Sequence, residues 1–224
     1  MVLLQIATDT TTAIESAQES ISILELASKG GVIMYPLFLM WIIAVYIFVE
    51  RLLTINKAGR VPESFMNNVR NLVERGDING AKLVCSQNDT PIARIVEKGI
   101  ARIGKPIENI EKAMENIGRL ELYKLEKNMV FLTIIAGVAP MFGFLGTIAG
   151  MIQTFFNISI TSDITLGTIA GGIYVKMITS ATGLIIGIMA YIGYSYLNAQ
   201  IDKVVNKMEG ASAEFIDVLH APVR

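Results

Sequence analysis

Three long apolar blocks constrain the fold of this chain more than any other feature. They span residues 32–49, 129–156 and 164–197, and besides tyrosine their only ionisable side chain is Lys176. A bilayer core of about 30 Å needs about 20 apolar residues of helix, so the first block is just sufficient and the other two are longer than required. Because 52% of the residues are hydrophobic and only 17% are charged, we expect an all-α membrane protein with three transmembrane helices.

The charged residues predict which side of the membrane each segment occupies. Residues 50–128 contain fourteen Lys and Arg residues, whereas residues 1–31 contain one and the connection 157–163 contains none. The positive-inside rule then places 1–31 and 157–163 outside, which is the periplasm if the membrane is a bacterial inner membrane, and 50–128 and 198–224 in the cytoplasm. No basic segment precedes an apolar run at the start, so we expect no signal peptide.

Helical periodicity predicts the elements outside the spans. Residues 1–31 are typical of an amphipathic helix at the periplasmic membrane surface, and 50–128 of short helices packed on a longer one that starts at Pro106. Without a breaker before Pro140, that helix is expected to continue through the second span to Phe156, over about 75 Å. The third span should likewise extend as a helix to Gly210, before a C-terminal tail.

The sequence offers little for catalysis. It contains one cysteine, Cys85, and one histidine, His220, so neither a disulfide nor a Cys/His metal site can be assembled. No nucleophile, base and orienting group occur together, so we expect neither an enzyme nor a cofactor. Cys85 is expected to be a small buried hydrophobe. The net charge of −1 and the lack of a basic cluster with interleaved aromatics argue against nucleic-acid binding.

Small and hydroxyl residues recur at helical spacing along the second and third spans. In the second span they are Thr133, Gly137, Pro140, Gly143, Thr147, Gly150 and Thr154; in the third they are Thr165, Thr168, Gly172, Lys176, Thr179, Gly183, Gly187, Ala190 and Tyr194, with Ser180 beside them. Steps of three and four place each set on one helix face. Such a face can allow close helix packing, which we favour for the glycines, or it can line an ion path. For Thr147, Thr179 and Ser180 both interpretations stay open.

Four segments resemble the MotA/TolQ/ExbB proton channel family, and the resemblance is strongest to its ExbB branch. They are GGVIMYPLFLMWIIAVYIFVERLL (30–53), RGDINGAKLVCSQNDTPIARIVEKG (75–99), APMFGFLGTIAGMIQTF (139–155) and GGIYVKMITSATGLIIGIMAY (171–191). The resemblance runs from about residue 30 to 205, and its most specific part is AP-x-x-G-x-LGT-x-x-G-M-I.

The resemblance implies a subunit of an energy-transducing motor in the bacterial inner membrane. In that family five copies form a ring whose second and third spans line a central pore. Two single-span ExbD-like partners occupy the pore, where their aspartate carries the proton, and a TonB-like protein delivers the work to outer-membrane transport. By motif, Thr147 and Ser180 are the pore hydroxyls.

The remaining expectations concern other residues of the two faces. We expect Lys176, Thr179, Thr133 and Thr154 to line the ion path as well, and Lys176, Gly183 and Gly187 to contact a partner or a neighbouring subunit. Lys176 would then face the ring lumen or a subunit seam; the alternative is that it snorkels to a membrane surface.

One position departs from the family pattern. Typical ExbB sequences have glutamate where this chain has Val175, and Lys176 cannot replace a carboxylate. MotA-like relatives also conduct without an acid there, so the departure assigns proton carriage to the partner. The alternatives that stay open are a TolQ-like or gliding-type stator driven by protons or sodium, and a non-conducting membrane scaffold.

Overall fold

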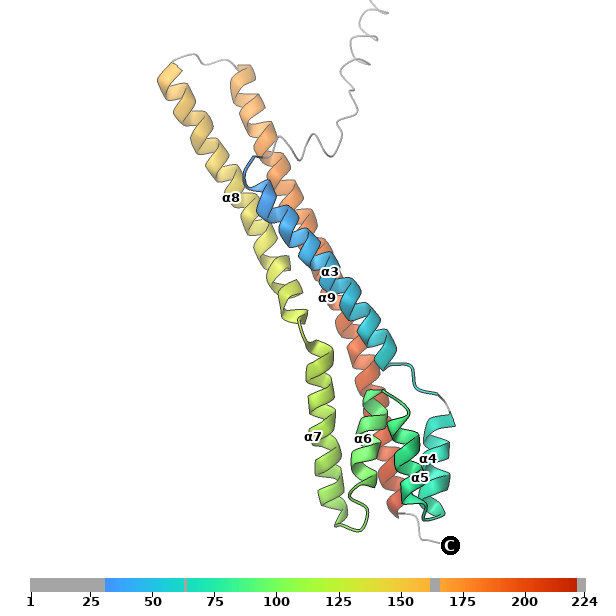
Figure 1. Cartoon of the computed structure of the whole chain (residues 1–224). Helices are drawn as coiled ribbons and strands as arrows, with labels where there is room; N and C mark the ends of the chain where they lie inside the picture. Colours follow the sequence, from blue (N-terminus) through green and yellow to red (C-terminus); the bar gives the residue numbers. More distant parts are fainter. Residues whose placement is uncertain (1–30, 63, 162–165, 221–224) are drawn as a thin grey trace, which may run out of the picture. The chain divides into compact units, whose positions relative to one another are not determined.

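A computed structural model describes residues 31–62, 64–161 and 166–220, and all regular elements among them are α-helices. The expected amphipathic helix at 1–31 lies, apart from Gly31, outside these residues. The helices are α3 (Met34–Ala58), α4 (Ser64–Glu74), α5 (Ile78–Ser86), α6 (Pro91–Ile100), α7 (Ile107–Glu126), α8 (Met129–Thr161) and α9 (Leu166–His220) (Figure 1). This confirms the all-α class.

Three stretches of the described chain are long and apolar enough to cross a membrane. They are Met34–Ala58, Ile107–Ile160 and Ile169–His220. Within Ile107–Ile160 the apolar part is α8, because α7 carries charged residues along its whole length. Many large apolar side chains of α3, α8 and α9 are exposed in the isolated chain, as expected for surfaces that face lipid or other helices.

The expected continuous helix from Pro106 to Phe156 is wrong. α7 ends at Glu126 and α8 begins at Met129, because Lys127 is extended (ψ 134°) and Asn128 adopts a left-handed conformation (φ 66°). Asparagine tolerates this conformation better than most residues and can terminate a helix just after its last turn. The break therefore needs neither glycine nor proline. Pro140 instead lies inside α8.

Two other helix ends also differ from expectation. α8 continues past Phe156 to Thr161, and in this last turn Ser159 donates a hydrogen bond to the carbonyl of Phe156 (2.8 Å). α9 passes through Gly210 to His220. A glycine costs a helix about 1 kcal/mol, which packing can offset, and the following Ala211 and Phe215 are both buried.

The chain forms two compact units, and α3, α8 and α9 each contribute to both. Unit 1 contains the described residues of Met1–Ile42 and Ala136–Ile188; unit 2 contains Ile43–Ile135 and Met189–Arg224. In unit 2 the consecutive helices α4, α5, α6 and α7 pack on one another. Its most deeply buried side chains include Phe65, Val69, Val96, Ile100, Leu197, Ile201 and Phe215.

Local signals explain the short helices of unit 2. Asp77 caps α5 by accepting a hydrogen bond from the Gly80 amide (2.9 Å), and Thr90 caps α6 by accepting one from the Ala93 amide (3.3 Å). Gly76 has a φ of 77°, which allows the tight turn between α4 and α5.

Candidate functional site

In unit 1, α8 and α9 meet so closely that their backbones touch. A Cβ atom added at Gly183 would lie 2.5 Å from the carbonyl oxygen of Ala139 and 2.9 Å from the Cα of Gly143. One added at Gly187 would lie 2.6 Å from the Cγ of Pro140. These positions therefore cannot accept even a methyl group unless the helices move apart.

We call Gly143, Gly146, Gly150, Gly183 and Gly187 the glycine seam. It supports the packing interpretation of the small residues. Gly183 and Gly187 contact α8 of their own chain, and their expected contact with a partner or neighbouring subunit stays a prediction. The sequence interpretation missed Gly146, where an added Cβ would lie 2.8 Å from the Cγ2 of Thr179.

Two of the predicted hydroxyl residues of α9 border this seam. Thr179 is completely buried. Ser180 is half-buried, and its Cα and carbonyl oxygen would each lie 3.1 Å from a Cβ at Gly143. The structure therefore brings both residues against α8.

The predicted threonines of α8 are placed differently. Thr147 donates a hydrogen bond to the Phe144 carbonyl (2.7 Å), and Thr154 donates one to the Gly150 carbonyl (2.9 Å). Both are partly exposed, and each hydroxyl oxygen keeps lone pairs that can accept a further hydrogen bond. Thr133 is exposed and belongs to unit 2, so the structure does not bring it together with the others.

Lys176 lies across Gly150 of α8. A Cβ at Gly150 would overlap the Cγ, Cδ and Cε atoms of the lysine, so the missing side chain makes the space that its methylenes occupy. Among the residues that the structure describes, no hydrogen bond or ion pair of the Lys176 ammonium is found. The sequence of the three predicted spans contains no Asp or Glu either. An anion that pairs with Lys176 inside the membrane must therefore come from another molecule.

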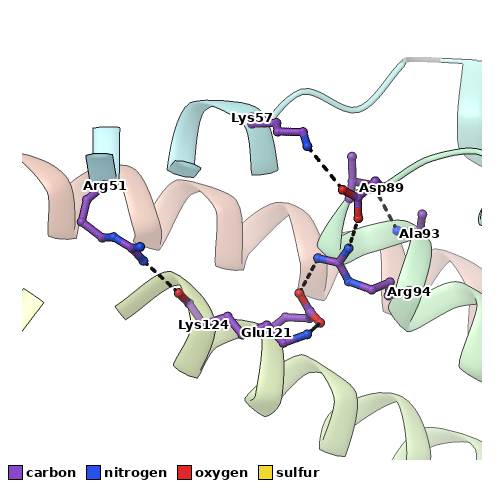
Figure 2. A network of polar contacts seen from close by, with 8 residues as sticks. Arg51, Lys57, Asp89, Ala93, Arg94, Glu121 and Lys124 are labelled. Carbon is purple, nitrogen blue, oxygen red and sulfur yellow. Dashed lines mark hydrogen bonds and ion pairs between the residues drawn. The ribbon is translucent and has the colours of Figure 1, made fainter. Parts of the chain in front are cut away.

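Unit 2 contains a second polar cluster, which the sequence interpretation missed (Figure 2). The Arg94 guanidinium binds Glu121 (2.6 Å) and Asp89 (2.5 Å), and Glu121 also accepts a hydrogen bond from Lys124 (2.7 Å). The Lys57 ammonium contacts the same Asp89 (3.3 Å). These contacts connect α3, α6 and α7; we call Lys57, Asp89, Arg94, Glu121 and Lys124 the charge network.

A buried arginine extends the connection between α3 and α7. Arg51 donates a hydrogen bond to the backbone carbonyl of Lys124 (3.1 Å) and pairs with the neighbouring Glu50. Its side chain is only 6% exposed. Since a charge this deeply buried is costly unless it is paired, Arg51 fixes the C-terminal part of α3 against the last turn of α7.

The charge network lies outside the membrane spans, and its charges shift the pKa values of its two carboxyl groups. Burial alone would raise the pKa of Glu121, but hydrogen bonds and charges from Arg94 and Lys124 bring that pKa below its ordinary value. The hydrogen bond from Lys57, with the charges of Arg94 and Lys57, lowers the pKa of Asp89. Both carboxylates are therefore ionised at neutral pH.

Neither cluster has the composition of a catalytic or metal centre. Within residues 31–62, 64–161 and 166–220, no three His, Cys, Asp or Glu side chains are grouped so that they could hold a metal ion. Cys85 is buried, and burial together with the charge of Glu97 raises the pKa of its thiol to about 12. Its thiol is therefore a poor nucleophile.

A match to a known family includes the glycine seam and all of the charge network except Lys57. The model of the MotA/TolQ/ExbB proton channel family matches residues 87–210, which is more than half of the chain and includes α6, α7, α8 and most of α9.

Individual relatives agree with this match. A protein of Methanothermobacter thermautotrophicus that is named as an ExbB homolog of biopolymer transport is 29% identical over 84% of this chain and 67% of its own length. The biopolymer transport protein exbB1 of Vibrio cholerae is 24% identical over 84% of both chains. The Tol-Pal system protein TolQ of Pseudomonas aeruginosa is 30% identical over 52% of this chain and 51% of its own length.

Proposed function

Because this chain belongs to the MotA/TolQ/ExbB proton channel family, we propose that it is an ExbB-like channel subunit of an inner-membrane motor. The motor would use the proton motive force to energise TonB-dependent outer-membrane transport. The family consists of membrane channel subunits rather than enzymes, and the similarity to ExbB-named proteins over 84% of the chain supports this branch.

The observation that carries the proposal is the seam between two membrane-spanning helices. Thr179, Ser180 and Lys176 are polar residues of α9 that lie against α8, and polar residues inside a membrane commonly mark an ion path. The backbones of α8 and α9 touch at Gly183, which leaves no room for an ion between them. An ion path would therefore run along the outer edge of this helix pair, past Ser180 and Thr147.

Such an edge becomes a closed path only when other chains cover it. We propose a homo-oligomer, with five copies as in the family, and two single-span ExbD-like partners within the ring. The partner's intramembrane acid would carry the proton, since the spans of this chain contain none. The same acid could pair with Lys176. A TonB-like protein would receive the work.

The charge distribution supports a periplasmic N-terminus and a cytoplasmic C-terminus. The loop with fourteen Lys and Arg residues would face the cytoplasm, so unit 2 would lie largely on that side. Its charge network would then hold the cytoplasmic end of α3 in register with α6 and α7 while the membrane spans work.

A TolQ-like stator is the second candidate, and the 30% identity with the Pseudomonas aeruginosa TolQ favours it. Hydroxyl groups can coordinate sodium as well as relay protons, so either ion could drive such a stator, including one of the gliding type. A third candidate is a non-conducting scaffold, which the tight glycine packing would suit.

Reconstitution of the chain with its single-span partner tests the proposal. We expect proton flux and growth under iron limitation to fall in Thr147→Val and Ser180→Ala, with ring assembly intact. Thr182→Val is the matched control, because Thr182 also donates to its own helix, at Ile178 (2.9 Å), but belongs to neither predicted face. Wild-type flux and growth in both test variants would refute the hydroxyl path, and flux that requires sodium would favour the stator alternative.

A further inference from the structure

A basic pocket lies between the end of α3 and the middle of α9, entirely within unit 2. It encloses about 590 Å³ and is lined by residues that include Gly59, Arg60, Gln200, Lys203, Asn206 and Lys207. Three of its lining residues are cationic, and no Asp or Glu is found among the described residues that line it. Its amide and cationic groups are donors suited to an anion that carries several oxygen acceptors.

The cations of this pocket are available to a ligand. Arg60 and Lys203 are exposed, and within the described part of the chain neither takes part in an ion pair. Lys207 donates one hydrogen bond to the carbonyl of Gly59 (3.1 Å), which leaves two of its three protons unused. This bond also covers a carbonyl at the negative end of α3, which would otherwise repel an anion.

The position of the pocket along the two helices indicates the source of the anion. The apolar block of α3 ends at Val49 and that of α9 at Leu197, whereas the pocket is formed by residues 55–60 and 200–207. At 1.5 Å per residue, Gln200 and Lys203 lie about 5 and 9 Å beyond the hydrocarbon, and Lys207 and Arg60 about 15–17 Å. The first of these is the depth of the lipid headgroups, and the long Lys and Arg side chains can extend back toward it.

We propose that this pocket binds the phosphate group of an anionic phospholipid from the adjacent leaflet. Basic pockets between membrane helices on the cytoplasmic side are suited to such headgroups, and their attraction is added to that of the leaflet's surface charge. A bound headgroup would hold the end of α3 to α9. This site is independent of the ion path, because none of its residues belongs to the two polar faces of the spans.

Spin-labelled lipids test the proposal with the full-length chain in phosphatidylcholine bilayers. We expect the protein to select spin-labelled phosphatidylglycerol over spin-labelled phosphatidylcholine, and Arg60→Gln/Lys203→Gln to reduce that selectivity about tenfold. Lys207 is left intact because its substitution would also uncap α3. Lys98→Gln/Lys112→Gln is the matched control, since it removes two exposed charges elsewhere in unit 2 and should keep the selectivity.

Several outcomes would overturn the proposal. They are equal binding of the two lipids by the wild type, full selectivity in Arg60→Gln/Lys203→Gln, and an equal loss in the control. If that double variant has lost helix content, Lys203→Gln alone replaces it, with an expected loss of about fivefold. Complete displacement of phosphatidylglycerol by millimolar inorganic phosphate would assign the pocket to a free anion instead. None of these results depends on ion flux, so they are distinguishable from failure of the channel proposal.

Discussion

In unit 1, α8 and α9 meet through glycine and backbone atoms, whereas in unit 2, α6 and α7 are joined by ion pairs among Asp89, Arg94 and Glu121. The described residues of unit 1 contain no Asp or Glu, and its lysine has no anionic partner among them. In unit 2 the buried charges are paired. The stability of unit 1 should therefore be sensitive to added side-chain volume and insensitive to acid. The stability of unit 2 should be sensitive to acid and less sensitive to added volume.

The chain provides one natural probe for each unit. Its single tryptophan, Trp41, belongs to unit 1, and its single cysteine, Cys85, belongs to unit 2. Fluorescence of the first and alkylation of the second can therefore follow the two units separately in the same sample.

The largest effect is expected from Gly183→Ala. Its Cβ would meet the backbone oxygen of Ala139, which cannot move without the rest of α8, so we expect a loss of about 3 kcal/mol of stability. Denaturant titration followed by Trp41 fluorescence measures it. Gly137→Ala is the control, because nothing lies within 4 Å of a Cβ there, and it should be neutral or slightly stabilising. Equal stability of the two variants would contradict the tight seam.

Removal of a charge from the network should destabilise unit 2 somewhat less than Gly183→Ala destabilises unit 1. Glu121→Gln leaves the Arg94 guanidinium without a buried anion, and because Arg94 is 36% exposed we expect about 2 kcal/mol, below the usual cost of breaking a fully buried pair. Glu115→Gln breaks the exposed pair with Arg119 and should cost less than about 0.5 kcal/mol. Alkylation of Cys85 in increasing denaturant compares the stability of unit 2 in the two variants. An equal loss of stability in both would mean that burial of the network is unimportant.

Acid should act on unit 2 alone. The folded pKa values of Glu121 and Asp89 lie below their ordinary values of about 4, so the unfolded chain binds more protons in acid. Their contribution to stability is complete above about pH 5 and is lost as the pH falls through the lowered pKa values. The midpoint of Cys85 exposure should therefore fall in acid, less steeply in Glu121→Gln, while the Trp41 midpoint stays constant. A parallel fall of both midpoints would contradict the comparison.

The sequence predicted the features that depend on local periodicity. Apolar length was enough to find the three spans, and steps of three and four placed Lys176 and Thr179 on one face of α9. In the structure this is the face that meets α8. The α7–α8 break was missed because a single left-handed Asn128 has no strong signal beside the helix-forming residues around it.

The charge network was missed for a different reason. Arg51 and Lys124 are 73 positions apart, and Arg94 and Glu121 are 27 apart, so their contacts depend on tertiary packing that no local pattern specifies. In the seam, Gly143 and Gly146 both meet α9, although steps of three and four along α8 selected only Gly143. The seam also needs both glycines, because the two helices cross closely over several turns.

Lys176→Met should change function more than stability. Methionine can fill the space over Gly150 that the lysine methylenes occupy, so we expect less than about 1 kcal/mol by Trp41 fluorescence but altered ion flux or partner binding. Gly150→Ala is the complementary variant, because it displaces the flexible lysine chain and keeps the charge. Normal flux and partner binding in Lys176→Met would leave snorkelling as the better account of this residue.

The smallest effect is expected for the alkylation rate of Cys85 in the seam variant Gly183→Ala. Because the folded pKa of this thiol is raised to about 12, alkylation near pH 8 proceeds almost entirely through opened forms of unit 2. Gly183→Ala should leave the alkylation rate within about twofold of the wild type if the seam and the charge network stabilise separate units. Glu121→Gln, measured beside it, should raise the rate roughly tenfold or more, since each 1.4 kcal/mol lost makes opening tenfold more frequent. If Gly183→Ala instead raises the alkylation rate as much as Glu121→Gln does, the continuous helices α3, α8 and α9 transmit opening from one unit to the other. The two kinds of contact would then support a single cooperative structure.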